Sequence, residues 1–350
     1  MEGQQAGAIQ RSSFFRKPPP PRSPILAREP VPALAPAPRP RQLTFRGSGG
    51  TLFGIHVVNV LLILVTLGVY YFWGKTRVRR YIFGQTEFEG DRFAYHGTAK
   101  ELLLGFAKAL VVFIVPIVAL TFVRDVLDVE PSIKGLAALL ISVLLLIFIP
   151  VAMVGARRYR LARTSWRGIR FSFRGRAWEF IGIFLKGSLL TGLTFGLYYP
   201  FFVTQRQAFL ISNSYFGNER FAFEARGRAL FWRFLLAIML TVPTLGLYWV
   251  WFLAWKRRFF WNHTRFGTAQ FQSTVTGGAL LGLYVVNALL LVFTLGLAWP
   301  WVKVRNIRFA FRYLTLGGPL DLTRIQQEAQ VATATGEGLA GFLDTGFDLG

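Results

Sequence analysis

Six long runs of apolar residues, separated by shorter polar segments, dominate the middle of the sequence. The runs occupy residues 51–73, 102–123, 136–154, 179–203, 229–253 and 279–301. Each is about as long as the roughly 20 apolar residues that a helix needs to cross the hydrocarbon core of a bilayer. Only a helix satisfies all of its backbone hydrogen bonds within one such segment. The pattern therefore predicts an all-α integral membrane protein with about six transmembrane helices.

The composition agrees with a membrane protein. Of the 350 residues, 53% are hydrophobic and 16% are charged, whereas a soluble domain has about 25% charged residues. The chain has no cysteine, which excludes disulfides, thiolate metal sites and a cysteine nucleophile. The net charge is +23, but basic residues cluster directly after apolar runs, as in 74–80, 155–163 and 255–258. This placement favours the bilayer and its anionic phospholipids as partners, and argues against nucleic acid.

Polar tails flank the apolar part, residues 43–320, which is expected to be one membrane domain. Ten prolines lie within residues 18–40, so we expect residues 1–42 to be a disordered proline-rich tail, with docking to a partner as the alternative. The tail lacks the long apolar stretch of a secretory signal. Residues 321–350 are polar and glycine-rich, which predicts a flexible C-terminal tail.

A Thr-x-Gly element recurs near the end of four apolar runs, at Thr66, Thr194, Thr244 and Thr294. Aromatic and then basic residues follow it, and the first and last copies agree most closely. The matching residues are Trp73, Lys75, Arg77 and Arg80 in the first copy, and Trp301, Lys303, Arg305 and Arg308 in the last. Alternating aromatic residues bounded by glycines come next, which is a strand or hairpin signal. The sequence predicts repeated units of span, Gly-aromatic exit, basic patch and short interfacial hairpin.

The segments Thr66–Arg77 and Thr86–Gly97 resemble the YjgN family of bacterial inner-membrane proteins, a domain of unknown function. The resemblance covers roughly residues 43–318. It implies a multi-pass protein of the bacterial inner (plasma) membrane and supplies no activity. The basic patches at Val203–Arg206 and Trp255–Arg258 lack the Trp-x-Lys-x-Arg pattern, which argues against one role common to all four.

Two groups of residues are candidates for function. The matching residues around Lys75 and Lys303 are expected to lie among anionic lipid headgroups, as general anchors or as a specific lipid or anion site. Asn59, Lys186 and Asn287 lie inside apolar runs, where an unpaired polar side chain is costly. They would line a polar pathway or substrate site. Alternatively, the asparagines hydrogen-bond between helices, and the ammonium group of Lys186 reaches the headgroups.

Catalytic patterns are not visible in the sequence. The histidines His56, His96 and His263 lack metal-ligand spacing, and there is no phosphate-binding loop, nucleophile elbow or carboxylate pair. We therefore expect no enzyme, no cofactor and no metal. Two functions fit the sequence: a transporter or channel-like protein with a pathway between repeats, and a non-catalytic envelope protein that binds anionic lipid or a protein partner.

The predicted topology contains a conflict. Six spans would place the matching basic patches that follow residues 73 and 301 on opposite faces of the membrane. Either the units are inverted repeats, as in many transporters, or one of the apolar runs does not cross the membrane.

Overall fold

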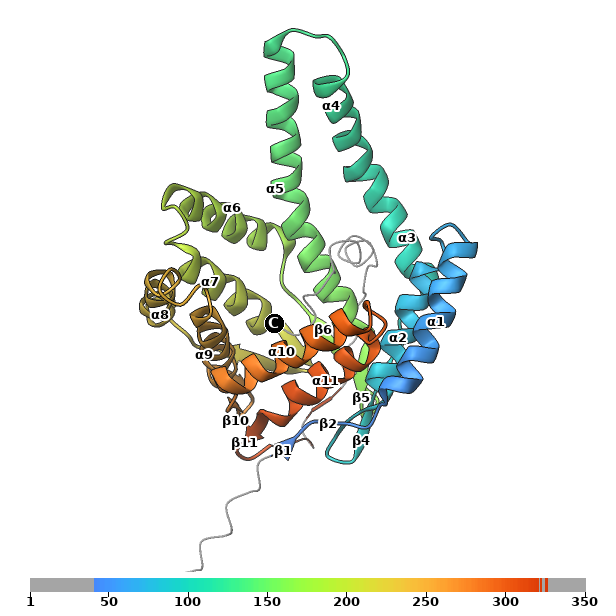
Figure 1. The fold of residues 1–350 in the computed structure, drawn as a ribbon, viewed down its shortest axis with the longest axis vertical. Coiled ribbons are helices and arrows are strands. Elements are labelled where there is room, and N and C mark those ends of the chain that lie inside the picture. Colours follow the sequence, from blue (N-terminus) through green and yellow to red (C-terminus); the bar gives the residue numbers. More distant parts are fainter. Residues whose placement is uncertain (1–40, 321, 323–324, 327–350) are drawn as a thin grey trace, which may run out of the picture. The chain divides into compact units, whose positions relative to one another are not determined.

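In the computed structural model of the chain, residues 41–320, 322 and 325–326 are described (Figure 1). Most of the two predicted tails lies outside the described residues. The exceptions are at the ends of the tails. Arg41–Gln42 form the first strand, β1, and the side chain of Ile325 is buried.

Five pairs of antiparallel helical arms follow one another along the described residues (Figure 1). Four pairs are short: α1 (Gly49–Val65) with α2 (Tyr71–Gly84), α6 (Ala177–Leu193) with α7 (Tyr199–Ser212), α8 (Gly227–Met239) with α9 (Tyr248–Asn262), and α10 (Gly277–Phe293) with α11 (Trp299–Arg312). The second pair in chain order is long. Its first arm consists of α3 (Ala99–Ala109), the π-helical stretch η1 (Leu110–Ile114) and α4 (Val115–Asp125), and its second arm is α5 (Pro131–Ala162).

Short strands connect the helical pairs. They are β2 (Thr44–Phe45), β3 (Thr86–Phe88), β4 (Asp91–Tyr95), β5 (Thr164–Trp166), β6 (Ile169–Phe173), β7 (Ser214–Phe216), β8 (Glu219–Phe223), β9 (Thr264–Phe266), β10 (Ala269–Ser273) and β11 (Leu314–Gly317). Together with β1 they form one antiparallel sheet in the order β1-β11-β10-β9-β8-β7-β6-β5-β4-β3-β2. Only Leu43 separates the two edge strands β1 and β2, so the sheet is a nearly closed barrel.

Aromatic side chains fill the barrel. Since side chains alternate between the two faces of a strand, every second residue points inward. The large side chains that pack together are Phe88, Phe93, Trp166, Phe171, Phe216, Phe221, Phe266 and Phe271, with Leu320, Leu322 and Ile325 against them. Ring centroids are 4.7 Å apart for Phe171 and Phe216 and 4.6 Å apart for Phe221 and Phe266. The barrel interior is therefore a packed core.

The helical pairs form a ring. Neighbouring pairs pack through α2 and α3, α5 and α6, α7 and α8, and α9 and α10. The ring closes because α11, the last helix, packs against α1, the first. Buried Leu52 of α1 and Val304 of α11 belong to the hydrophobic cluster at this closure.

The predicted all-α fold with six transmembrane helices is wrong. Four of the six apolar runs break at their Thr-x-Gly element, where the chain turns back and starts a second helix. In the first copy, Thr66 is the C-cap of α1, and Leu67 and Gly68 follow with φ angles of 50° and 94°. The left-handed conformation of these two residues ends the helix. The predicted hairpins exist, but they pair edge to edge and build the barrel.

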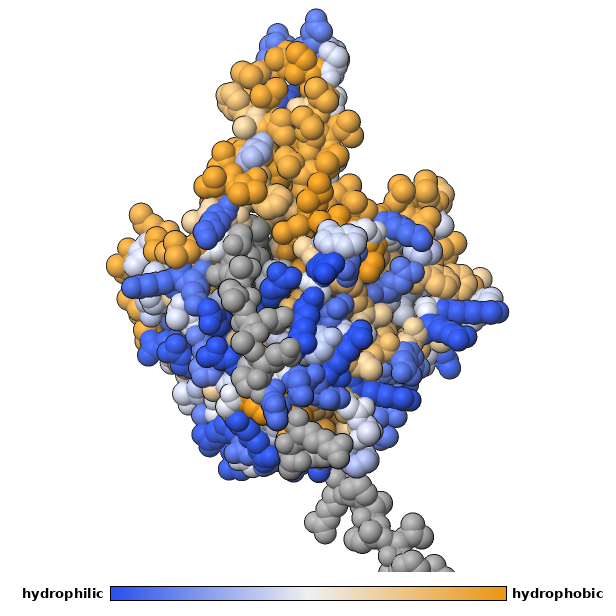
Figure 2. Space-filling view, turned by 180° about the vertical axis from the view of Figure 1, so that it is seen from behind, coloured by the Kyte–Doolittle hydropathy of each residue, from blue (hydrophilic) through white to orange (hydrophobic). Residues whose placement is uncertain are grey.

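Among the described residues, two helical segments are long and apolar enough to cross a membrane. They are Ala99–Asp125, with 27 residues, and Pro131–Ala162, with 32 residues. Figure 2 shows hydrophobic residues gathered on this long pair and on the shoulders beside it, and hydrophilic residues at the opposite end. The apolar surface thus lies at the end that carries the candidate spans.

A basic cavity inside the helical ring as the candidate functional site

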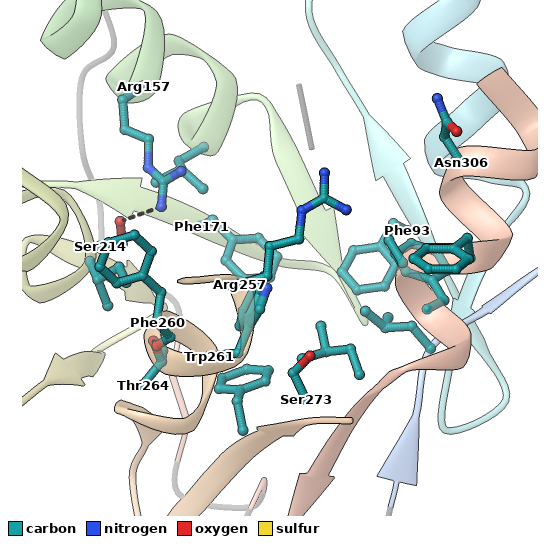
Figure 3. Close-up of a pocket in the computed structure, with 18 of the residues that line it drawn as sticks. Phe93, Arg157, Phe171, Ser214, Arg257, Phe260, Trp261, Thr264, Ser273 and Asn306 are labelled. Atoms are coloured by element: carbon teal, nitrogen blue, oxygen red, sulfur yellow. Dashed lines mark hydrogen bonds between the residues drawn. The ribbon is translucent and has the colours of Figure 1, made fainter. Parts of the chain in front are cut away.

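The helical ring encloses a cavity of about 1850 Å³ that reaches down to the inner face of the barrel (Figure 3). The second helices of the pairs supply most of its polar wall, and the strands supply aromatic side chains. Ile63, Leu67 and Val69, at the turn between α1 and α2, line another part of it. The cavity thus combines an apolar wall with a polar belt.

Six basic residues line this cavity: Arg41, Arg157, Arg206, Lys256, Arg257 and Lys303. No aspartate or glutamate is among the described residues that line it. Cations that share a cavity with low-dielectric walls reinforce one another's potential. The site therefore attracts anions.

These basic residues are positioned by the connection between the second helix of each pair and the strand that follows it. Arg157 and Arg257 each lie seven residues before the first residue of the following strand, and Arg206 and Lys256 each lie eight residues before it. Seven residues are about two turns of an α-helix, so equivalent positions in different pairs face the same way. The strands all belong to one barrel, and these positions therefore converge on the space enclosed by the ring.

Most of the cavity cations contact neutral groups. Arg157 donates from Nη2 to Ser214 Oγ at 3.2 Å (Figure 3), and its buried Nε has no hydrogen-bond acceptor within the described residues. Lys256 donates to the hydroxyl of Tyr199 at 3.1 Å, with its ammonium 5.5 Å from the ring centroid. Among the six, only Arg41 has a carboxylate partner within the described part of the chain, Glu89 at 3.2 Å.

Two other cavity arginines are placed for contact with a ligand. Arg257 extends into the cavity in Figure 3, and its Nη2 donates a long hydrogen bond of 3.5 Å to the hydroxyl of Tyr284. Burial lowers the pKa of the Arg206 guanidinium, because the charged form loses hydration. A bound anion would offset this loss and would satisfy the remaining N–H donors.

The predicted lipid-binding residues do not come together. Lys303 lines the cavity, whereas Lys75 is half-buried with its ammonium 5.8 Å from the ring centroid of Tyr71. The other six are exposed on the outside of the ring: Trp73, Arg77, Arg80, Trp301, Arg305 and Arg308. Arg308 also donates to the carbonyl of Gly47 at 2.8 Å.

The three predicted intramembrane polar residues are also separate. Asn59 is buried and donates to the carbonyl of Gly74 at 3.3 Å. Asn287 is buried and donates to Asn306 Oδ1 at 2.7 Å. Each asparagine thus links the two helices of its own pair. Lys186 is exposed on α6 and is not part of the cavity wall.

The sequence interpretation missed Arg157, Arg206, Lys256 and Arg257, because it treated the basic clusters only as headgroup anchors. A usable signal was their constant distance from the Thr or Ser that begins the next strand. Among the described residues there is no group of three or more His, Asp or Glu residues that could hold a metal ion.

The chain matches the family described as "Bacterial protein of unknown function (DUF898)" over residues 40–255 and again over residues 241–342. It therefore belongs to this family, and the resemblance noted in the sequence is confirmed. No solved structure matches the chain.

Curated relatives carry the name Inner membrane protein YjgN. The protein from Salmonella typhimurium is 36% identical over 142 residues, which are 40% of this chain and 33% of the relative. Proteins from two Escherichia coli strains are 36% and 31% identical over 129 residues, which are 37% of this chain and 30% of each relative. The chain thus spans about a third of the length of these relatives. Family membership places it among membrane proteins, in the inner membrane.

Proposed function

We propose that this protein is a non-catalytic inner-membrane protein that binds an anionic lipid in the basic cavity. The observation that carries the proposal is the combination of five cations, which have no carboxylate partner among the described residues, with a wall that is mainly aromatic and aliphatic. A lipid has both parts, an anionic headgroup and apolar chains. A small hydrophilic anion would leave the apolar wall unused.

The chemistry of the cavity suits a phosphate-containing headgroup. Guanidinium groups bind phosphate oxygens through paired N–H donors, and such charge-assisted hydrogen bonds are stronger than neutral ones. Arg157, Arg206 and Arg257 come from three different helical pairs. They can therefore surround one headgroup from several sides. The cavity volume of about 1850 Å³ also exceeds the roughly 300–1,000 Å³ of ordinary small-molecule pockets.

We further propose that the long helical pair crosses the bilayer. Its arms of 27 and 32 residues correspond to about 40 and 48 Å at 1.5 Å per residue, more than the roughly 30 Å of the hydrocarbon core. The five helical pairs would be internal repeats of one ancestral unit, which the common order of helix, helix and strands supports.

The same geometry favours lipid binding over transport of a solute. A pathway along the axis of the ring would have to pass through the barrel. The aromatic side chains of the barrel core occupy that space, with Trp166, Phe216 and Phe266 among the buried residues. At the barrel the cavity is lined by these aromatic side chains, which suit a bound apolar molecule better than a passing hydrophilic solute.

Short-chain lipids test the proposal. Purified protein is titrated with dioctanoyl phosphatidylglycerol and with dioctanoyl phosphatidylcholine below their micelle concentrations, and binding is followed by calorimetry. We expect the anionic lipid to bind and the zwitterionic lipid to bind much more weakly. The double variant Arg206→Gln/Arg257→Gln should bind the anionic lipid at least about tenfold more weakly, since hydrogen bonds to charged groups contribute about 1.5–3 kcal/mol each.

The matched control removes two arginines from the outside of the ring. Arg77 and Arg305 are exposed and lie outside the cavity, so Arg77→Gln/Arg305→Gln changes net charge equally. It should leave the affinity nearly unchanged. An equal loss of affinity in both double variants would indicate non-specific surface attraction and would refute the cavity site.

A further inference from the structure

We infer that the four Thr-x-Gly turns insert into one leaflet of the bilayer, so that the four short helical pairs enter the membrane and return to the same face. The inference concerns the four turns; the middle residues Phe195, Leu245 and Leu295 lie outside the cavity wall of the proposed lipid site, whereas Leu67 is part of it. It is carried by the exposure of the turns, by their backbone conformation and by their hydrogen bonds.

Each turn presents a large apolar side chain to its surroundings. The middle residue of the element is Leu67, Phe195, Leu245 or Leu295, and these side chains are 94%, 98%, 97% and 93% exposed. All four have φ between 48° and 50°, a left-handed conformation in which glycine or asparagine is usual. An apolar residue at this position is unfavourable in water both by strain and by exposure. In the hydrocarbon of a leaflet, contact of this apolar side chain with its surroundings is favourable.

The backbone amides of each turn are satisfied without water. In the fourth turn, every amide from Thr294 to Trp299 donates to an acceptor inside the turn. The acceptors are the carbonyls of Leu290, Val292, Leu291, Thr294 and Gly296 and, for Ala298, the hydroxyl of Thr294 at 3.0 Å. The threonine hydroxyl itself donates to the Leu290 carbonyl at 2.6 Å.

The other three turns repeat this pattern. Their threonine hydroxyls accept the amides of Tyr70, Tyr198 and Tyr248 at 2.9, 2.9 and 3.2 Å. The remaining amides of each turn donate to carbonyls of the same turn. An irregular segment normally leaves such groups to water, and hydrocarbon offers no replacement. The Thr-x-Gly element therefore meets the requirement of a bilayer for its backbone N–H donors.

Helix length and charge limit the depth of insertion. The first helices of the short pairs have 13–17 residues, fewer than the roughly 20 needed for a span. Exposed Arg77 and Arg305 lie six residues after the first residues of α2 and α11, which is about 9 Å along the helix. With these guanidinium groups at headgroup level, the turns reach into one leaflet only. Figure 2 shows the apolar shoulders at the same end as the long pair.

Site-directed spin labelling tests the insertion directly, because the chain has no cysteine of its own. Single cysteines replace Leu67, Phe195, Leu245 and Leu295 in turn, and the labelled protein is reconstituted into liposomes of phosphatidylethanolamine and phosphatidylglycerol. We expect each label to be more accessible to oxygen than to a water-soluble nickel complex. A cysteine at exposed Arg92 of β4 is the control and should show the opposite ratio.

A second measurement distinguishes return from crossing. Gly50 and Arg80 are exposed near the outer ends of α1 and α2, and Gly50→Cys and Arg80→Cys are treated with a membrane-impermeant maleimide from either side. Both should react from the same side. Reaction from opposite sides would overturn the inference in favour of a span, and tip labels that favour the nickel complex would overturn it in favour of a hydrated turn. If one tip variant does not fold, the other three give the result.

Discussion

The threonine of a Thr-x-Gly turn should contribute more to stability than other threonines in apolar helices. Thr294→Val keeps the shape and the β-branched backbone preference of the side chain and removes only the hydroxyl. The Ala298 amide then loses its acceptor, which lies at 3.0 Å. Leaving a buried donor unsatisfied costs about 1–3 kcal/mol. We expect Thr294→Val to lower the free energy of unfolding by about this amount in a lipid environment.

Thr121→Val is the matched control for this prediction. The hydroxyl of Thr121, in α4, donates to the carbonyl of Ile117 at 2.8 Å, but it accepts no hydrogen bond from a backbone amide of the described residues. Its loss should cost about 0.5 kcal/mol or less. Reversible unfolding in lipid–detergent micelles with increasing sodium dodecyl sulfate, followed by tryptophan fluorescence, compares the two. Equal stability of the two variants would show that water replaces the threonine hydroxyl, and the argument for a dry turn would be refuted.

Two further predictions concern helix packing and pH. A Cβ atom on Gly277 would collide with the ring of Trp251, whereas one on Gly278 would face open space. Gly277→Ala should therefore lower the free energy of unfolding by about 1–3 kcal/mol. Gly278→Ala should leave it nearly unchanged in the same unfolding assay. Burial, and then three neighbouring arginines, lower the pKa of His96. As the pH falls, His96 therefore binds a proton at a higher pH in the unfolded chain than in the folded protein. The free energy of unfolding should consequently decrease as the pH falls below about 6.5. His96→Gln should make the pH dependence shallower, and an unchanged slope would contradict the assignment.

The sequence predicted the recurring elements better than it predicted their arrangement. The apolar runs, the four Thr-x-Gly elements and the aromatic strand segments all correspond to real features. The error lay in treating residues 51–73 and the three similar runs as continuous helices. One turn hardly changes the mean hydropathy of an apolar run. The aromatic residues that follow Gly68 are also as apolar as the residues at the end of a transmembrane helix. The left-handed residues that reverse the chain are visible only in the backbone.

The barrel and the cavity depend on contacts that local patterns do not report. Tyr95 of β4 pairs with Thr164 of β5, although the entire long helical pair separates these two strands in the sequence. The sequence of a short strand does not identify its partner strand, so the sequence predicted the short interfacial hairpins without their pairing into a barrel. The basic cavity was missed for the same reason. Arg157 and Arg206 line one cavity because neighbouring helical pairs pack side by side, and Lys303 was the only predicted candidate among the cavity cations.

The barrel also resolves the topological conflict in the sequence. All of its strands must lie on one face of the membrane, because they hydrogen-bond to one another in a single sheet. Each helical pair therefore has to begin and end on that face, either by crossing twice, as the lengths of α3–α4 and α5 allow, or by turning back within a leaflet. A single crossing between β2 and β3 would separate two strands that are paired at Phe45 and Thr86. The matching basic patches after residues 73 and 301 thus lie on the same face, and no inverted repeat is needed.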